Sequence, residues 1–155
     1  MLRFALIACT VLAVVSFAAP RPASAADAAQ MEANKKTVAA FYDTYLNKKD
    51  YDETIKFIGA AGYKQHNPTA KDGIEGIKGF INFLKEKYPN NHSEIKKIFA
   101  DGDYVIVHVH SVREPGTRGN AIVDIFRMDN AGKVVEHWDV VQPIPETAQN
   151  DNTMF

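Results

Sequence analysis

The sequence is poor in cysteine and has no excess of basic residues, and both absences narrow its possible functions. Its only cysteine, Cys9, lies near the start of the 155-residue chain, in a segment that we expect to be removed. The remaining chain therefore has no disulfide and no cysteine-based metal site. Lysine and arginine number 18 against 19 aspartates and glutamates. Nothing in this balance indicates a nucleic-acid partner, which would need a clustered basic surface.

Several common catalytic motifs are also missing from the sequence. It has no Gly-rich phosphate-binding loop, no H-E-x-x-H zinc motif and no evident serine nucleophile arranged with a histidine and an acid. Proton transfer by carboxylates and imidazoles remains as the chemistry that the sequence permits. We expect no cofactor.

The first 25 residues have the pattern of a secretory signal peptide. A short positive start, Met1-Leu2-Arg3, precedes the apolar run from Phe4 to Ala19, and Ala23-Ser24-Ala25 supplies the small residues of a cleavage site. The apolar run is short for a membrane-spanning helix. We therefore expect cleavage after Ala25, a periplasmic or secreted location without membrane contact, and a single domain over residues 26–155.

The order of the expected elements predicts the fold class. Helical spacing of apolar residues precedes a change to a period of two, and short turns separate the later segments, which makes neighbouring strands antiparallel. Helices followed by a strand meander indicate an α+β fold, a cone-shaped curved antiparallel sheet with three N-terminal helices on its concave face. The helices are expected over residues 26–49, 50–58 (capped by Asp50) and about 74–88, an extended piece over 63–67, and strands over 94–100, 103–112, 120–128 and 133–142.

Alternation along the last two expected strands places three ionisable side chains on one face. Asp124 shares its face with Ile122 and Phe126, while His137 and Asp139 share theirs and lie opposite Trp138. On the preceding strand, His108 and His110 share a face.

Symmetric hairpin connections would then set the pairing between these strands. They place His110 opposite Asp124, Asp124 opposite His137, and Ile122 opposite Asp139. We therefore expect a row formed by His110, Asp124 and His137, with His108 and Asp139 on its flanks. A slip of one residue in either turn would divide this set between the two faces.

Two interpretations of this polar row remain open: a buried ion-pair network that only stabilises the sheet, and the wall of a pocket. Apolar neighbours on the same face argue against a solvated surface, and burying several ionisable groups is costly unless they pair or serve a site. We favour the pocket. Apolar walls raise a carboxyl pKa and a nearby imidazolium lowers it, so Asp124 can be an acid, a base or a neutral hydrogen-bond donor. A metal site formed by His108, His110, His137 and Asp139 is an alternative.

Several strings together resemble one known family. YKQHNP, FADGDYVIVHVH, VDIFRM, GKVVEHWDVVQPIPE and the terminal NTMF are similar to those of the SnoaL-like branch of the nuclear transport factor 2-like superfamily, over essentially all of residues 26–155. The resemblance implies a cystatin-like cone-shaped fold with a pocket for a small hydrophobic molecule. It also implies a polyketide cyclase, isomerase or aldol-type activity, and a homodimer.

The segment VDIFRMDNAGKVV resembles the corresponding hairpin of the ketosteroid isomerases. By this resemblance Asp124 takes the place of the carboxylic acid of the oxyanion hole, and Tyr42 takes that of its partner tyrosine. Asn67 stands where the isomerases have their proton-abstracting aspartate, and an amide cannot act as that base. His66 could substitute if it faces inward. The pairing of Asp124 with His110 is similar in residue type to that of the polyketide cyclases.

The sequence thus predicts an exported pocket protein that moves a proton next to the carbonyl group of a hydrophobic compound. A non-catalytic periplasmic binding module is the alternative. Dimerisation is expected through the opposite sheet face, at Val123, Ile125, Trp138 and Val140. The expected catalytic residues are Asp124, His110, His137 and Tyr42, and the expected substrate-binding residues are His66, Asn67, His108, Ile122, Phe126 and Asp139.

Overall fold

The structure is a computed structural model and describes residues 25–155. The predicted signal peptide therefore lies outside the described residues, except for Ala25. Over the described range, every helix is too short or too polar to cross a membrane.

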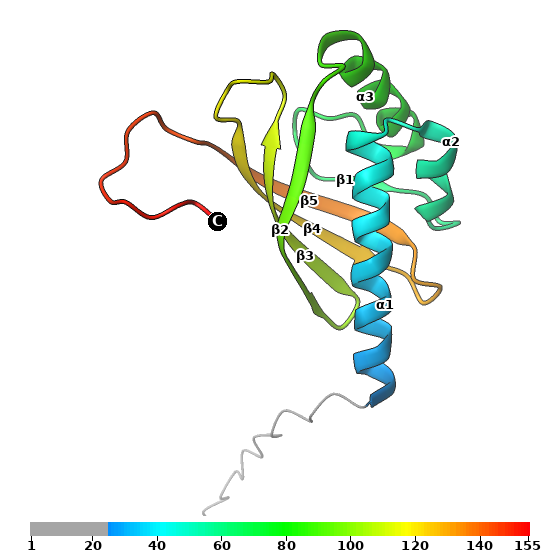
Figure 1. Cartoon of the computed structure of the whole chain (residues 1–155). Helices are drawn as coiled ribbons and strands as arrows, with labels where there is room; N and C mark the ends of the chain where they lie inside the picture. Colours follow the sequence, from blue (N-terminus) through cyan, green and yellow to red (C-terminus); the bar gives the residue numbers. More distant parts are fainter. Residues whose placement is uncertain (1–24) are drawn as a thin grey trace, which may run out of the picture.

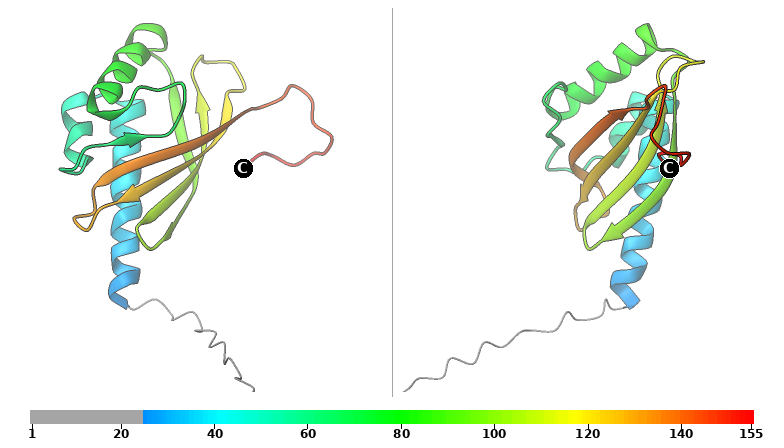
Figure 2. Two further views of the ribbon diagram at one scale, coloured as in Figure 1. Left: turned by 180° about the vertical axis from the view of Figure 1, so that it is seen from behind. Right: turned by 90° about the vertical axis from the view of Figure 1, so that its left-hand side faces the viewer.

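A five-stranded curved sheet with helices on one face forms the described chain, which confirms the α+β prediction (Figures 1 and 2). The strand order is β1-β5-β4-β3-β2, and the neighbours from β5 to β2 are antiparallel. The short β1 pairs in parallel with β5 at the edge of the sheet. The strands are β1 (Lys64–Gln65), β2 (His92–Asp101), β3 (Tyr104–Val112), β4 (Asn120–Met128) and β5 (Val134–Pro143).

The N-terminal helical region is divided more finely than the sequence predicted. The α-helix α1 (Ala25–Tyr42) passes into a π-helical turn, η1 (Asp43–Asn47), instead of continuing to residue 49. A π-helical turn changes the direction of the following side chains and often occurs at functional sites. The expected cap is confirmed, because the side chain of Asp50 accepts a hydrogen bond from the backbone N–H of Glu53 at the start of α2 (Tyr51–Thr54), which leads into η2 (Ile55–Phe57).

The core lies between the helices and the concave face of the sheet. The helix expected over about 74–88 is α3 (Gly73–Lys87), and its apolar stripe buries Ile77, Ile81 and Leu84. On α1, the Phe41 ring packs edge-to-face against Phe126 of β4, with ring centroids 5.7 Å apart. Burying such side chains is the main stabilising contribution to the fold.

The predicted pairing of β3 with β4 is wrong. Asp124 lies opposite Val107, not His110, which instead lies opposite Ala121. The loop closes with Ser111 opposite Asn120, and Gly119, at a φ of 75°, approaches the Ser111 carbonyl so closely that a Cβ would lie 2.3 Å from its oxygen. The register therefore differs from the expectation by three residues, and an odd difference moves side chains to the other face.

The predicted pairing of β4 with β5 is wrong by two residues, which preserves the face. Asp124 lies opposite Asp139, and His137 lies opposite Phe126. The difference arises at the turn, where a register shift separates Arg127 from Met128. Because two is the period of a strand, Asp124, His137 and Asp139 still share the concave face, as predicted.

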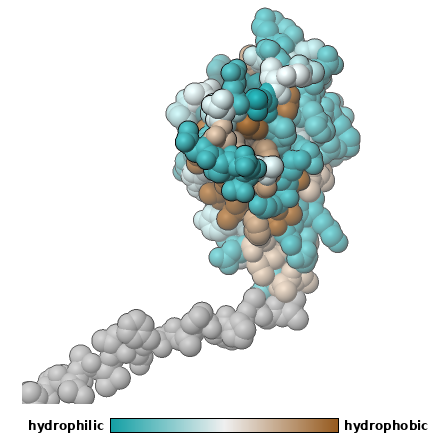
Figure 3. Space-filling view, turned by 60° about the vertical axis from the view of Figure 1, so that its left-hand side comes forward, coloured by the Kyte–Doolittle hydropathy of each residue, from teal (hydrophilic) through white to brown (hydrophobic). Residues whose placement is uncertain are grey.

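The convex face of the sheet carries the two histidines of β3. The ring of Phe155, at the end of the C-terminal tail, lies 5.1 Å from the His108 ring and 4.9 Å from the His110 ring between centroids. Apolar side chains are exposed on the same sheet, with Val140 71% exposed and Val123 38% exposed. Figure 3 views the molecule from this side and shows hydrophobic residues gathered there beside hydrophilic ones.

Candidate functional site

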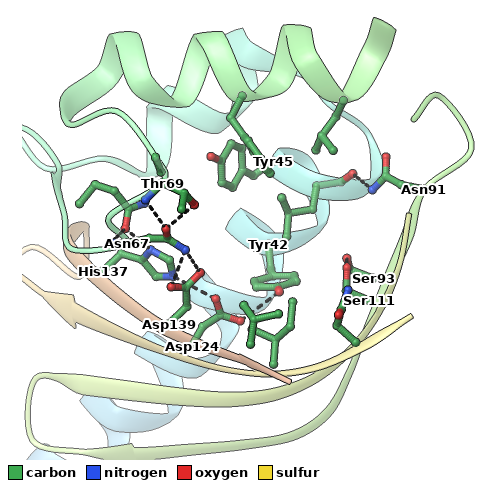
Figure 4. Close-up of a pocket in the computed structure, with 18 of the residues that line it drawn as sticks. Tyr42, Tyr45, Asn67, Thr69, Asn91, Ser93, Ser111, Asp124, His137 and Asp139 are labelled. Carbon is green, nitrogen blue, oxygen red and sulfur yellow. Dashed lines mark hydrogen bonds and ion pairs between the residues drawn. The ribbon is translucent and has the colours of Figure 1, made fainter. Parts of the chain in front are cut away.

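A cavity of about 470 Å³ opens between the concave face of the sheet and the helices. Its wall carries Tyr42 from α1, Asp124 from β4, and His137 and Asp139 from β5, and Figure 4 shows their polar atoms directed toward one another. Apolar and aromatic side chains supply much of the remaining wall. A concave site of this size with a few convergent polar groups is typical of small-molecule binding.

Three buried side chains form a continuous hydrogen-bonded chain on this wall. The Tyr42 hydroxyl donates to Asp124 Oδ2 at 3.0 Å, and Asp124 Oδ1 lies 2.9 Å from His137 Nε2. Tyr42 is 3%, Asp124 5% and His137 8% exposed. Burial raises the pKa of Tyr42 well above its usual value, and the nearby Asp124 raises it further, so the hydroxyl keeps its proton.

The surroundings of Asp124 favour the protonated form of its carboxyl group. Burial raises its pKa and outweighs the hydrogen bonds from His137 and Tyr42, which lower it. The carboxylate of Asp139, directly opposite on β5, acts in the same direction as burial. A carboxyl group kept neutral by its surroundings can donate a hydrogen bond or a proton.

Gln65, which the sequence reasoning missed, orients the imidazole of His137. Gln65 Oε1 accepts a hydrogen bond from the backbone N–H of Asn67 at 2.8 Å, which identifies this atom as the amide oxygen. The same oxygen lies 3.0 Å from His137 Nδ1. Because an amide oxygen only accepts, Nδ1 must carry a hydrogen. In a neutral ring Nε2 then has the lone pair, so its contact with Asp124 is made through one shared proton.

Asn67 faces the cavity and anchors the second carboxylate. Its side-chain nitrogen lies 2.7 Å from Asp139 Oδ1 and 2.8 Å from Oδ2. Its own oxygen accepts from the backbone N–H and the hydroxyl of Thr69, which fixes the orientation of the amide. Asn67 therefore positions Asp139 on the cavity wall.

His66 faces away from the cavity, contrary to its expected role in substrate binding. Its ring stacks on Trp138, with centroids 4.5 Å apart, and its Nε2 lies 2.7 Å from Glu136 Oε1. Arg127 binds the other oxygen of Glu136, and the two partners lower the pKa of that carboxyl group. Alternation in β1 and the residues after it directs Gln65 and Asn67 inward and His66 outward.

His108 and His110 also lie outside the cavity, so the structure corrects three of the predicted site positions. These two histidines cannot join His137 and Asp139 in a metal site, because the sheet separates them. Among residues 25–155, the atoms that could hold a metal together are those of Asp124, His137 and Asp139, which lie within 4.8 Å of one another. The other predicted site residues, Tyr42, Asn67, Ile122, Asp124, Phe126, His137 and Asp139, line the cavity.

The fold and the cavity together define a pocket-bearing α+β domain with a buried acid on its sheet. The sequence profile of the SnoaL-like domain matches residues 38–137, more than half of the chain. The protein belongs to this family, and the predicted resemblance is confirmed. A search of the curated proteins finds no match.

Solved structures of similar proteins share the fold. A SnoaL-like protein of unknown function from Burkholderia thailandensis has a TM-score of 0.60 and 16% identity, covering 72% of this chain and 96% of that one. A cystatin-fold protein from Novosphingobium aromaticivorans has a TM-score of 0.58 and 22% identity, with coverages of 69% and 97%. A candidate polyketide cyclase from Bacillus cereus has a TM-score of 0.59 and 21% identity, with coverages of 70% and 74%.

Proposed function

We propose that the protein is an exported acid–base enzyme that moves a proton next to the carbonyl group of a hydrophobic small molecule. The observation that carries this proposal is the buried chain of Tyr42, Asp124 and His137 on the wall of the cavity. It joins a donor that keeps its proton, a carboxyl group with a raised pKa and an imidazole of fixed orientation. The candidate polyketide cyclase among the similar structures is consistent with such chemistry.

The two carboxylates divide the reaction between them. Asp139, held by Asn67 on the cavity wall, removes a proton from the carbon next to the carbonyl group. The electron pair moves to the carbonyl oxygen. The Tyr42 hydroxyl or the Asp124 carboxyl group turns its hydrogen from its partner in the chain to that oxygen and donates a hydrogen bond or the proton. Return of a proton to the same or another carbon completes an exchange or an isomerisation, and attack of the enolate on a second carbonyl completes a cyclisation.

Proton exchange on a simple ketone tests this proposal. α-Tetralone in D2O should exchange the hydrogens next to its carbonyl group faster with the protein than without it, as followed by proton NMR. Asp124→Asn should lower the exchange rate by about 100-fold or more. Asp103→Asn, the same change at an exposed carboxylate, should leave it unchanged.

The non-catalytic binding module has a distinct outcome in the same experiment. If α-tetralone binds, as line broadening or chemical-shift changes report, but does not exchange faster than in buffer, the cavity is a binding site only. Exchange that survives Asp124→Asn would remove this residue from the mechanism.

Export of the protein belongs to the same proposal. Residues 1–25 should be removed on export, and mass spectrometry of the protein from the periplasm or medium should find Ala26 as the first residue. A chain recovered uncleaved from the cytoplasm would contradict export.

A second copy is proposed to cover the convex face, on which Val140 and Val123 are exposed. Val140→Lys should convert a dimer to a monomer in sedimentation velocity, because it places a charge in an apolar contact. Lys48→Glu, on the helical side, serves as the control. A wild-type monomer at micromolar concentration would contradict the dimer.

A further inference from the structure

The concave face of the sheet carries a second polar row, at the other end of the cavity from Asp124. Ser93 of β2 pairs with Ser111 of β3, and Ser111 pairs with Asn120 of β4, so the three residues lie side by side across three strands. All three line the cavity. Figure 4 shows Ser93 and Ser111 on the opposite side of the cavity from Asn67, His137 and Asp139.

An apolar row separates this polar row from the acid–base site. Ile95, Val109, Ile122 and Val141 pair across β2, β3, β4 and β5 between the two polar rows. Asn120 and Asp124 are four positions apart on β4, and a strand rises about 3.3 Å per residue. The two polar rows are therefore about 13 Å apart along the sheet. The wall is polar at both ends and apolar between them.

The second polar row is rich in hydrogen-bond donors. The hydroxyl oxygens of Ser93 and Ser111 lie 2.9 Å apart, and whichever donates to the other leaves one hydroxyl hydrogen free. Within residues 25–155, these hydroxyls have no other partner and the side-chain amide of Asn120 has none. Asn91 also lines the cavity: its side-chain nitrogen donates to Leu46 O, and its side-chain oxygen is a buried acceptor without a partner in residues 25–155.

Arg113 adds a positive charge at the same end. It follows Ser111 by two positions, so alternation directs it to the same face, and it lines the cavity. Its guanidinium carbon lies 5.6 Å from the centre of the Tyr88 ring, and within the described chain no carboxylate pairs with it. The carboxylates that line the cavity in residues 25–155 are Asp124 and Asp139, and both belong to the other end.

We infer that the Ser93–Ser111–Asn120 row and Arg113 form a carboxylate-binding subsite for the substrate. This inference rests on the proposed function for the reacting end. The substrate is then an elongated amphipathic keto acid, with its carbonyl group at Tyr42 and Asp124, an apolar middle, and a carboxylate about 13 Å away. Arginine and hydroxyl donors suit a carboxylate because charge-assisted hydrogen bonds are the stronger ones.

Binding, measured separately from turnover, tests this subsite. Straight-chain methyl-ketone carboxylic acids of graded length and their methyl esters are titrated against the protein by calorimetry at neutral pH. We expect the dissociation constant to pass through a minimum at a length that spans the two rows. At that length the acid should bind about tenfold or more tightly than its ester.

Two variants assign this preference to the subsite. Arg113→Gln should abolish the preference for the acid, and Ser111→Ala should reduce it several-fold, while Arg118→Gln, an exposed arginine of the same loop, should leave it unchanged. Equal affinity for acids and esters, failure of every acid to bind, or a preference that survives Arg113→Gln would overturn the inference. Asp124→Asn should retain the preference, so a protein that binds acids without exchanging protons would contradict the proposed function alone.

Discussion

The hydrogen bond between Gln65 Oε1 and His137 Nδ1, 3.0 Å long, joins two strands that are far apart in the sequence and fixes the protonation of an imidazole. It exists because β1 pairs in parallel with β5, with Gln65 directly beside His137. The other ring nitrogen, Nε2, then faces Asp124. Gln65 therefore influences how His137 and Asp124 share the proton between them.

Removing this acceptor should change the tautomer of His137. In Gln65→Leu, the neutral ring is free to place its hydrogen on Nε2 and donate to the Asp124 carboxylate. Nitrogen-15 NMR of the labelled imidazole should show Nδ1 protonated in the wild type and Nε2 protonated in the variant. Gln149→Leu, in the exposed tail, is the control. An unchanged Nδ1–H signal in the variant would contradict this assignment.

Asp124 should make the stability of the protein depend on pH. Its pKa is raised in the folded state from an ordinary value of 3.8, so the folded protein favours the neutral form. The contribution of Asp124 to stability is therefore fully present below pH 3.8 and is lost as the pH rises through the raised value, because the unfolded chain ionises first.

Asp124→Asn should remove this dependence. The amide of the variant can donate to His137 Nε2 and accept from Tyr42, and so mimics the neutral acid. Urea unfolding across a pH series should show the wild type losing stability relative to the variant as the pH rises above about 4. A wild type that gains stability relative to Asp124→Asn over this range would contradict the raised pKa.

Tyr42→Phe isolates the hydroxyl that donates to Asp124. The change keeps the ring in the core but leaves Asp124 Oδ2 buried without this donor. We expect a loss of about 1–3 kcal/mol in the free energy of unfolding, measured with urea. Tyr104→Phe, at a side chain that is 40% exposed, should cost less than about 0.5 kcal/mol. Equal effects of the two changes would show that the Tyr42 hydroxyl is not a buried donor.

Exchanging the amide of Asn67 and the carboxylate of Asp139 should restore the stability that a single substitution removes. Asn67→Asp places a second carboxylate at the position of a donor that lies 2.7 Å from Asp139 Oδ1, so the variant should lose stability at neutral pH and recover at acidic pH. The double variant Asn67→Asp, Asp139→Asn restores one donor and one carboxylate and should regain most of the thermal stability. A double variant no more stable than Asn67→Asp would contradict the pairing.

Much of the site could be predicted because it depends on local periodicity. Alternation along β4 and β5 placed Asp124, His137 and Asp139 on one face, and a two-residue error in their register did not change this. The family resemblance implied the place of Tyr42 opposite Asp124, and the hydrogen bond between them matches it. The α3 stripe and the Asp50 cap are also local patterns, and both occur in the structure.

The sequence by itself therefore determined which segments form helices and strands and which polar residues share a face, because these follow from the geometry of neighbouring residues. Only the tertiary structure decided how the strands align. The β3–β4 loop sets Ser111 opposite Asn120, a register that leaves His108 and His110 on the convex face, and the parallel pairing of β1 brings Gln65 to His137. Contacts of this kind depend on chain segments that are distant in the sequence, and no local pattern records them.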